Sequence, residues 1–387
     1  MKLKIVLAVV TLGSGLFVGC GVPENDKTKN SSIINQKVAL GSKLYSDKTL
    51  SANETMSCAT CHDLNGGLID TRSTSKVFGA SLGDNAIAIG DRNAPTAGYA
   101  MFSPEFHFDD AEGIYIGGQF LDGRAINLKE QAKGPFLNPI EMGMSNEAAV
   151  VAKVRKSDTY MASFQAIYGR DIFNDTMAAY DAIADSIASF EKSEIFSAFD
   201  SKFDKFLAGN YTLSDAEQRG LDIYSNEADE VGAGRCTLCH PIAKEGDNPP
   251  LMTDYSYDNL GVPVNIALRI KNGKSGSLDE GLYSNPEVSD TNLKGAFKVA
   301  SLRNVAVTGP YMHNGIFKEL ATVIHFYNTR DIGGINPETG KMWEVGEFHS
   351  GRNTDELGNL GLSSAQEDDL VAFLKIFTDA KYESLIK

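Results

Sequence analysis

Cys58-Ala59-Thr60-Cys61-His62 recurs as Cys236-Thr237-Leu238-Cys239-His240, 178 residues further along a chain of 387 residues. C-x-x-C-H is the attachment signature of c-type haem, because two thiols on one turn can each add to a vinyl group and the next His can bind the iron. The alternatives are two structural disulfides, a zinc site or a thioredoxin-like redox pair. Zinc favours a compact Cys/His set, whereas these pairs lie far apart. The sequence therefore predicts two covalent c-type haems, with His62 and His240 as iron ligands.

The context of the two motifs is also repeated. Gly41–Ser46 and Gly220–Ser225 both read Gly-x-x-[Leu/Ile]-Tyr-Ser, about 17 and 16 residues before their motifs. Such internal similarity indicates one unit used twice. Each unit also closes with apolar residues at helical spacing, which are Tyr180, Ile183, Ile187 and Phe190 in the first and Leu370, Phe373 and Phe377 in the second.

The remaining segments predict a mainly α fold of two cytochrome c-like domains with long loops, each holding one covalent haem. Residues 63–134 and 241–296 carry many Gly, Asn, Asp and Pro, which is typical of loops. Ala148 to Phe164 reads as one helix, and no strand-rich region emerges. We place the domains at 36–205 and 206–387, with Phe199, Phe203 and Phe206 anchoring the linker.

The N-terminus has the pattern of an export signal. Lys2 and Lys4 precede an apolar run of 14 residues, Ile5 to Val18, which is too short to span a bilayer. The run ends in Gly19-Cys20, similar to a bacterial lipobox, although Phe17 departs from the usual Leu. Residues 1–19 are thus predicted to be a lipoprotein signal peptide and 20–35 a polar tether, with the protein periplasmic and lipid-anchored through Cys20. Ordinary secretion with an incidental Cys20 is the alternative.

Composition limits the partners. The chain carries 36 Lys+Arg against 51 Asp+Glu, a formal charge of −15, which becomes −17 once the two Lys of residues 1–19 are removed. Nucleic acid is disfavoured because phosphate binding needs clustered basic residues. With 42% apolar and 22% charged residues, disorder over most of the chain is excluded. A basic or small neutral partner is expected.

Further motifs resemble the bacterial dihaem cytochrome c peroxidase/MauG family over about residues 35–380. They are Arg92-Asn93-Ala94-Pro95-Thr96, Asp122-Gly123-Arg124-Ala125, Gly134-Pro135-Phe136-Leu137-Asn138-Pro139-Ile140-Glu141-Met142-Gly143, Ser301-Leu302-Arg303-Asn304-Val305 and Pro310-Tyr311-Met312-His313-Asn314-Gly315.

The resemblance implies a peroxidatic haem on His62. Glu141 would lie on its distal side and move a proton of bound H2O2, Gln131 would orient the peroxide, and Pro135 would limit access to the iron. A solvated carboxylate is the alternative for Glu141. In other members a His in the loop after the first motif blocks the iron until the second haem is reduced. Here residues 63–91 contain no His, and His107 comes only after Arg92-Asn93. We therefore expect an open iron and no need for reductive activation.

The resemblance also implies an electron-transferring haem on His240. Its distal ligand in other members is a Met 17 residues after the Pro of Pro-Tyr-x-His, and here that position is Tyr327. A phenolate lowers the reduction potential relative to a thioether, and a Tyr there is similar to MauG, which oxidises residues of a partner protein. The alternatives are His325, then Met312 and Met342, or Tyr327 as core filler.

A calcium ion between the haems is implied as well. Its ligands would be the side chain of Asn93 and the carbonyls of Thr308 and Pro310, oxygen donors that suit a hard cation. A turn role for Asn93 is the alternative.

One departure concerns the route between the haems. Family members often carry Trp before Asp-Gly-Arg, whereas this chain has Leu121; its single Trp is Trp343, and Gly234 stands where MauG has a surface Trp. Charge sharing between the haems would then be slower or pass through Tyr115 or Phe120.

Three functions remain open at this stage. The first is a peroxidase that reduces H2O2 at the His62 haem with electrons from a small cytochrome c or cupredoxin, relayed through the His240 haem. The second is a MauG-like oxidase that uses peroxide to modify a protein partner, and the third is an electron carrier. The sequence leaves a homodimer open and predicts membrane contact only through the lipid anchor.

Overall fold

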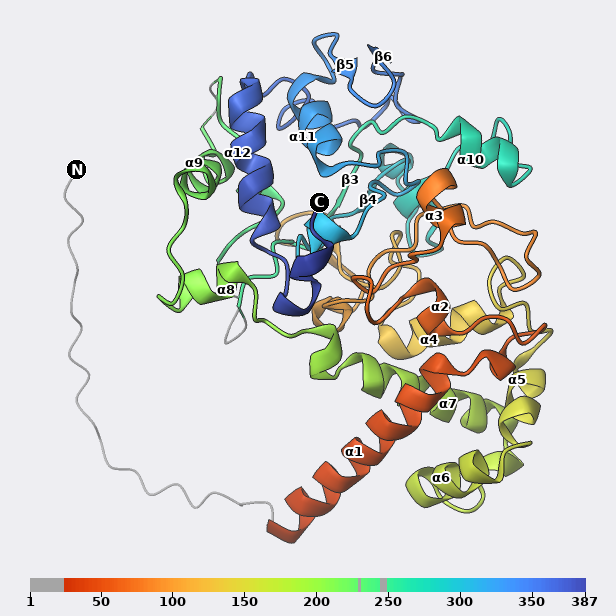
Figure 1. The fold of residues 1–387 in the computed structure, drawn as a ribbon. Helices are drawn as coiled ribbons and strands as arrows, with labels where there is room; N and C mark the ends of the chain where they lie inside the picture. The colour runs from red at the N-terminus through yellow and green to blue at the C-terminus, as the bar shows by residue number, and fades with distance from the viewer. Residues whose placement is uncertain (1–23, 229–230, 244–248) are drawn as a thin grey trace.

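A computed structural model describes residues 24–228, 231–243 and 249–387, and its helices supply most of the framework (Figure 1). The N-terminal half contains α1 Glu24–Ser46, α2 Cys58–Cys61, α3 Ser73–Phe78, α4 Leu128–Leu137, α5 Glu147–Val154, α6 Asp158–Tyr168 and α7 Thr176–Glu191. The C-terminal half contains α8 Lys202–Leu207, α9 Asp215–Tyr224, α10 Ile266–Lys271, α11 Leu320–Thr329 and α12 Ser364–Lys375.

Sheet structure is limited to short pairs. The strands of the described residues form three two-stranded antiparallel sheets, β1 His107–Asp109 with β2 Ile114–Ile116, β3 Tyr257–Asp258 with β4 Phe297–Lys298, and β5 Ile335–Asn336 with β6 Lys341–Met342. The prediction of a helix-rich fold with long loops is therefore confirmed. Within the described ranges, every helix is too short or too polar to cross a membrane.

Two helix pairs repeat the same packing. Helix α1 packs on α7 and also contacts α2 of the first motif, and α9 packs on α12 (Figure 1). The second pair lies beside the second motif, because the hydroxyl of Tyr224 at the end of α9 donates to the His240 carbonyl. Both contacts use a glycine, because a Cβ at Gly41 would lie 1.9 Å from the Ser186 carbonyl oxygen and one at Gly220 would lie 2.2 Å from that of Asp369. The ring pairs match as well: Tyr45–Phe190 and Tyr224–Phe373 are both edge-on with centroids 5.3 Å apart. The repeat read from the sequence is thus a repeat of structure.

Each helix pair centres a separate hydrophobic core. The first core gathers residues between Leu40 and Phe196 together with Tyr382, and the second gathers residues between Phe203 and Phe377. Phe203 is buried in the second core at the start of α8, where Phe206 packs against it, while Phe199 contacts Tyr99. The division at 205/206 stays a prediction, and the change of core falls a few residues earlier, between Phe196 and Phe203.

A buried arginine ties the segments around this point together. The Arg303 guanidinium is 1% exposed and forms a bidentate ion pair with Asp204 at 2.6 and 2.9 Å. It also donates to the Pro250 carbonyl and lies over the rings of Tyr99 and Phe199. A charge enclosed this completely is tolerated only when its donors are all engaged.

One prediction about local structure is wrong. The single helix expected over Ala148 to Phe164 is two helices, because the Ser157 side chain caps the N-terminus of α6 and ends the helical path between Val154 and Asp158. The segment predicted as a tether over 20–35 is helical from Glu24 onward, as part of α1, and its role as a tether stays a prediction. The predicted signal peptide and the lipid site at Cys20 lie outside the described residues.

Candidate haem cavities and their ligands

The two C-x-x-C-H motifs form equivalent turns. The first is the short helix α2 and the second a 3-10 turn over Cys236–Leu238, and in both the His backbone N–H donates to the carbonyl of the first Cys, at 2.9 and 2.8 Å. Each turn therefore places two thiols and an imidazole close together. This is the local geometry that c-type haem attachment requires.

Each motif His is held by a backbone carbonyl. His62 Nδ1 lies 3.2 Å from the Leu68 carbonyl oxygen, and His240 Nδ1 lies 2.8 Å from that of Met252. Leu68 and Met252 both have positive φ, 61° and 51°, so the same unusual backbone turn delivers both carbonyls. Because a carbonyl only accepts, Nδ1 must carry the proton, which leaves Nε2 as the basic nitrogen. Burial also lowers the pKa of both imidazoles and favours the neutral form that binds iron.

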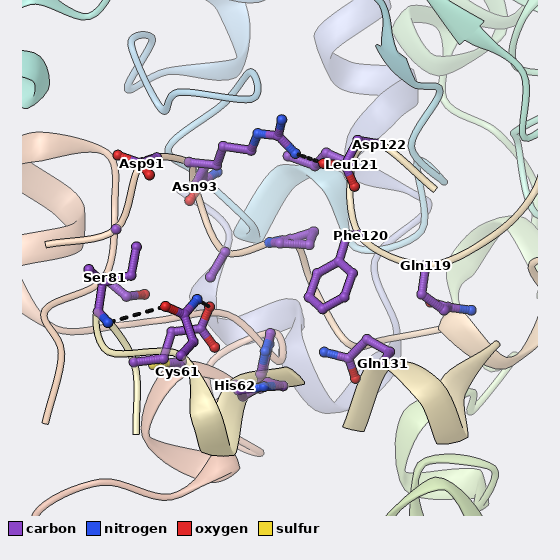
Figure 2. A pocket seen from close by; sticks show the side chains of 18 of the residues that line it. Cys61, His62, Ser81, Asp91, Asn93, Gln119, Phe120, Leu121, Asp122 and Gln131 are labelled. Atoms are coloured by element: carbon purple, nitrogen blue, oxygen red, sulfur yellow. Dashed lines mark hydrogen bonds and ion pairs between the residues drawn. The ribbon is translucent and has the colours of Figure 1, made fainter. Parts of the chain in front are cut away.

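The first motif opens into a cavity of about 730 Å³. Figure 2 shows His62, Phe120 and Gln131 around one space, with Leu121 and Asp122 on the segment that follows Phe120. The structure brings all six predicted residues of this site to the cavity wall: Cys58, Cys61, His62, Gln131, Pro135 and Glu141. The two Cys lie on α2 and His62 directly after it, Gln131 and Pro135 lie on α4, and Glu141 lies in the loop after α4. Tertiary packing, not sequence proximity, brings these segments to one cavity.

Glu141 is held with one oxygen engaged. Asn138 Nδ2 donates to Glu141 Oε1 at 2.8 Å, and the Glu141 carbonyl accepts from the Asp84 N–H. Burial raises the pKa of Glu141, and the Asn138 hydrogen bond and the charge of Arg124 lower it in part. The second carboxylate oxygen has no hydrogen bond to another described side chain. The carboxyl group can therefore exchange a proton with a small molecule in the cavity.

Polar and apolar side chains share the remaining wall. Gln131 and Pro135 lie on α4, and Phe120 contributes a ring whose outer face is covered by the Arg124 guanidinium at 3.7 Å. Arg124 is fixed by its ion pair with Asp122 at 2.7 Å. The Gln131 amide can both donate and accept and has no hydrogen bond to another described side chain, so it is suited to orienting a polar ligand.

The cavity contains one histidine among the described residues. His62 lines it, whereas His107 lies in β1 with its Nδ1 2.8 Å from the Glu105 carbonyl oxygen. The two methionines on the wall, Met56 and Met142, are buried in the first hydrophobic core. This arrangement supports the expectation of an open iron face, which stays a prediction.

The second motif opens into a cavity of about 360 Å³ lined by Cys236, Cys239, His240 and Tyr327. Tyr327 lies on α11, and its hydroxyl has no hydrogen bond to any described residue. Burial raises the pKa of Tyr327, so a cation at this site would be needed to favour its phenolate. A Tyr facing a cavity and free of partners is suited to ligating iron.

The alternatives to Tyr327 are placed differently. His325 turns away from the cavity, with Nδ1 2.9 Å from Glu367 Oε1, and the Met342 side chain is 63% exposed on β6. Met312 does line the cavity. Tyr327 and Met312 thus remain as candidate ligands on geometric grounds.

The two cavities share one partition. Residues 93–96 and 119–121, together with Ala100, line both of them, so Phe120 and Leu121 stand between the haem sites. Asn93 of this partition donates through Nδ2 to the Pro310 carbonyl at 2.5 Å, and Thr308 lines the second cavity nearby. The three predicted calcium ligands therefore come together, but Asn93 would have to turn its amide oxygen toward an ion. Tyr115 does not belong to the partition: it lies on β2 with its ring stacked on Phe106.

Several ionisable residues of the cavities were not predicted, among them Glu191 and Lys298. Glu191, at the end of α7, lines the first cavity, and Lys298 of β4 lines the second and donates to the Gly118 carbonyl at 2.6 Å. Burial lowers the pKa of Lys298 to about 8. The repeat itself carried a signal for Glu191, since alignment of Phe190 with Phe373 puts Glu191 opposite Leu374.

Comparison with known proteins agrees with this arrangement. A family model described as di-haem cytochrome c peroxidase matches residues 35–212. The methylamine utilization protein MauG of Paracoccus denitrificans is 42% identical over 356 residues, which cover 90% of each chain. The chain belongs to the di-haem cytochrome c peroxidase/MauG family. Membership implies two c-type haems, and the two Cys-Cys-His turns with their cavities fit that group.

Other relatives extend across both named branches. Cytochrome c peroxidase Ccp of Escherichia coli is 34% identical, covering 81% of this chain and 58% of that protein. The crystal structure of the diheme peroxidase BthA from Burkholderia thailandensis superposes with a TM-score of 0.79 at 29% identity, covering 91% of this chain and 88% of that one. A MauG-like protein associated with microbial copper homeostasis gives a TM-score of 0.64, also at 29% identity, and covers 91% of each chain.

Proposed function

We propose that this protein is a dihaem peroxidase that reduces H2O2 to water in the first cavity, with electrons relayed through the second. The observation that carries the proposal is the meeting of His62, Glu141 and Gln131 in one cavity that has no second histidine among its described residues. A c-type haem bound through Cys58, Cys61 and His62 would supply an iron that binds peroxide and delivers electrons to it.

The side chains of the cavity supply the proton chemistry. With Oε1 held by Asn138, the free oxygen of the Glu141 carboxylate can accept a proton from one peroxide oxygen and return it to the other, which leaves as water. Two electrons and two further protons would convert the remaining oxygen to the second water. The Gln131 amide can both donate and accept, so it can orient the peroxide. Pro135 and Phe120 limit the water that competes for the same site.

The second cavity would hold the electron-transfer haem through Cys236, Cys239 and His240, with Tyr327 as the sixth ligand. A calcium ion held by Asn93, Thr308 and Pro310 would sit in the partition between the haems. The donor would be a small redox protein, a cytochrome c or a cupredoxin. We place the protein in the periplasm, anchored through a lipidated Cys20, with a homodimer as an open assembly.

A second candidate function is oxidation of a partner protein in the manner of MauG. Tyr327 at the wall of the second cavity favours it, as does the 42% identity to MauG. Leu121 in the partition opposes it, because an aliphatic side chain cannot carry an oxidising equivalent between the haems. We therefore place peroxide reduction first.

One experiment separates the two functions. The holoprotein is given H2O2 and either a reduced small cytochrome or cupredoxin, or no donor and a periplasmic extract. Peroxide-dependent donor oxidation at many turnovers supports the peroxidase. A new covalent modification of one extract protein, found by mass spectrometry with negligible donor oxidation, supports the MauG-like oxidase. An electron paramagnetic resonance spectrum of the oxidised protein with low-spin haem only would contradict an open iron in the first cavity.

A further inference from the structure

Among the carboxyl groups on the wall of the first cavity, Glu191 has no ion pair with a described cation, and the proposed proton chemistry does not use it. Glu191 ends helix α7, lines the cavity and is only 7% exposed. Its Oε2 atom is buried without a hydrogen-bond partner, and so is the hydroxyl oxygen of Tyr45, a fully buried residue of α1. Orphaned buried polar atoms are rare in folded proteins, so two of them near each other call for an explanation.

Several observations place Glu191 and Tyr45 together beside the first motif. Helices α1 and α7 pack on each other, and Tyr45 contacts the ring of Phe190, the residue that precedes Glu191. The charge of Glu191 contributes to raising the pKa of both Tyr45 and Cys58, after the larger effect of burial. Glu191 therefore lies on the Cys58 side of the cavity.

The internal repeat gives a direct comparison. Gly41 contacts Ser186 and Phe190 as Gly220 contacts Asp369 and Phe373, so Glu191 is the structural counterpart of Leu374. Leu374 is 4% exposed and lines the second cavity.

The matching tyrosines differ too. Tyr224 donates its hydroxyl to the His240 carbonyl, whereas Tyr45 has no such bond. The first unit therefore has an acid, Glu191, where the second has Leu374, and the neighbouring Tyr45 hydroxyl lacks the hydrogen bond that Tyr224 makes.

The surroundings of Glu191 determine how it can act. Burial alone raises the pKa of its carboxyl to about 8. The charge of Glu191 acts on Tyr45 of α1 and on Cys58 of α2, and Cys58 is also affected by Cys61 and Glu141. The two thiols cease to titrate once they are thioethers. Glu191 thus has no compensating cation, and its charge depends on the other charges of the cavity.

We propose that Glu191 and Tyr45 form a proton-holding site in the first cavity, bridged by buried water, that takes up one proton when the haem there gains an electron. The balance is simple: a one-electron donor reduces ferric to ferrous iron, and the Glu191 carboxylate binds one proton from solvent to become a neutral acid. Oxidation reverses both. The added electron and the added proton leave the net charge of the site unchanged. Because an uncompensated charge is costly in a buried, poorly solvated site, burial favours the uptake of the proton together with the electron. The inference rests on the proposed haem in the first cavity, and the second cavity, with Leu374, lacks the site.

The test is a spectroelectrochemical titration of the dihaem holoprotein between pH 6 and 9, following each haem separately. One proton per electron lowers the potential of the His62 haem by about 59 mV for each tenfold fall in proton activity. We expect a slope approaching this value over part of the range. In Glu191→Gln and Glu191→Leu the slope should be lost at the His62 haem and the slope of the His240 haem unchanged.

A matched variant and a second measurement complete the test. Glu141→Gln, which removes another carboxyl group of the same cavity that has no ion pair, should keep the slope. Infrared difference spectra of reduced minus oxidised protein should contain a new protonated-carboxyl band that Glu191→Gln removes. An unchanged slope in both Glu191 variants, or a slope lost only in Glu141→Gln, overturns the proposal. Peroxide turnover is assayed separately, so a wild-type protein without peroxidase activity would refute the proposed function and leave this result readable.

Discussion

Replacement of Glu141 by Gln is the sharpest test of the proposed peroxide chemistry. Gln keeps an oxygen that can accept the hydrogen bond from Asn138 Nδ2, now 2.8 Å from Glu141 Oε1, so the side chain should stay in place. What the substitution removes is the capacity to take up and return a proton. General acid–base catalysis of this kind contributes about 10²–10⁴-fold, so we expect peroxide turnover to fall about 10²-fold or more, which is roughly 2.7 kcal/mol in the barrier.

The assay is steady-state oxidation of a reduced cytochrome or cupredoxin by H2O2, with rates expressed per haem. Asn138→Ala serves as the matched control, because it leaves the carboxyl and removes only its anchor. A charge-assisted hydrogen bond of about 1.5 kcal/mol corresponds to a loss of about tenfold. Turnover by Glu141→Gln within about threefold of the wild type would refute the reasoning.

The pH profile adds an independent check. A base must be ionised to accept a proton, and burial raises the pKa of Glu141. Turnover should therefore decline on the acid side at a pH above the ordinary range of a glutamate, and this limb should be missing from the residual activity of Glu141→Gln. A profile identical in both proteins would assign the limb to another group.

Three further predictions concern the second cavity and the fold. Tyr327→Met should raise the reduction potential of the His240 haem, since a thioether stabilises ferric iron less than a phenolate does; an unchanged potential in a redox titration would remove Tyr327 as a ligand. Arg303→Met should lower the free energy of unfolding by about 3–5 kcal/mol in urea titrations, because it leaves the Asp204 carboxylate without its partner; a loss under 1 kcal/mol would argue against that ion pair. Burial would raise the pKa of Asp84, but hydrogen bonds from the Ser51 and Thr55 hydroxyls and from the backbone N–H groups of Asn53 and Thr55 outweigh it and lower that pKa to about 2. Its stabilisation is therefore complete above the unfolded-state value near 4 and lost as the pH falls toward 2, and Asp84→Asn should remove that part of the acid dependence measured by circular dichroism.

The sequence predicted the parts of the site that depend on local pattern. C-x-x-C-H is a single turn, so Cys58, Cys61 and His62 could be assigned from their spacing, and the structure places their equivalents in a matching turn. The convergence of Glu141 and Gln131 on His62 was reached only through the resemblance to a family. No local rule predicts that α4 lies across from α2.

The failures have physical causes of the same kind. The turn of His325 toward Glu367, 42 residues away, is a tertiary contact that spacing cannot reveal. The break before α6 arises because Ser157 caps a helix instead of continuing one. A serine is compatible with either role, so its helix propensity alone does not predict the break. A cavity position for Glu191 was not predicted, because this residue follows Phe190 at the end of an apolar helix, where a charged side chain is expected to face solvent.

The partition of residues 93–96 and 119–121 has an evolutionary consequence. Because Leu121 lines both cavities, any substitution at this position alters the surroundings of both haem sites at once. A substitution in the partition that adapts one haem site to a new function will therefore be retained only if the other haem site keeps its function. Sequence differences between related proteins should therefore accumulate at residues that line only one of the two cavities.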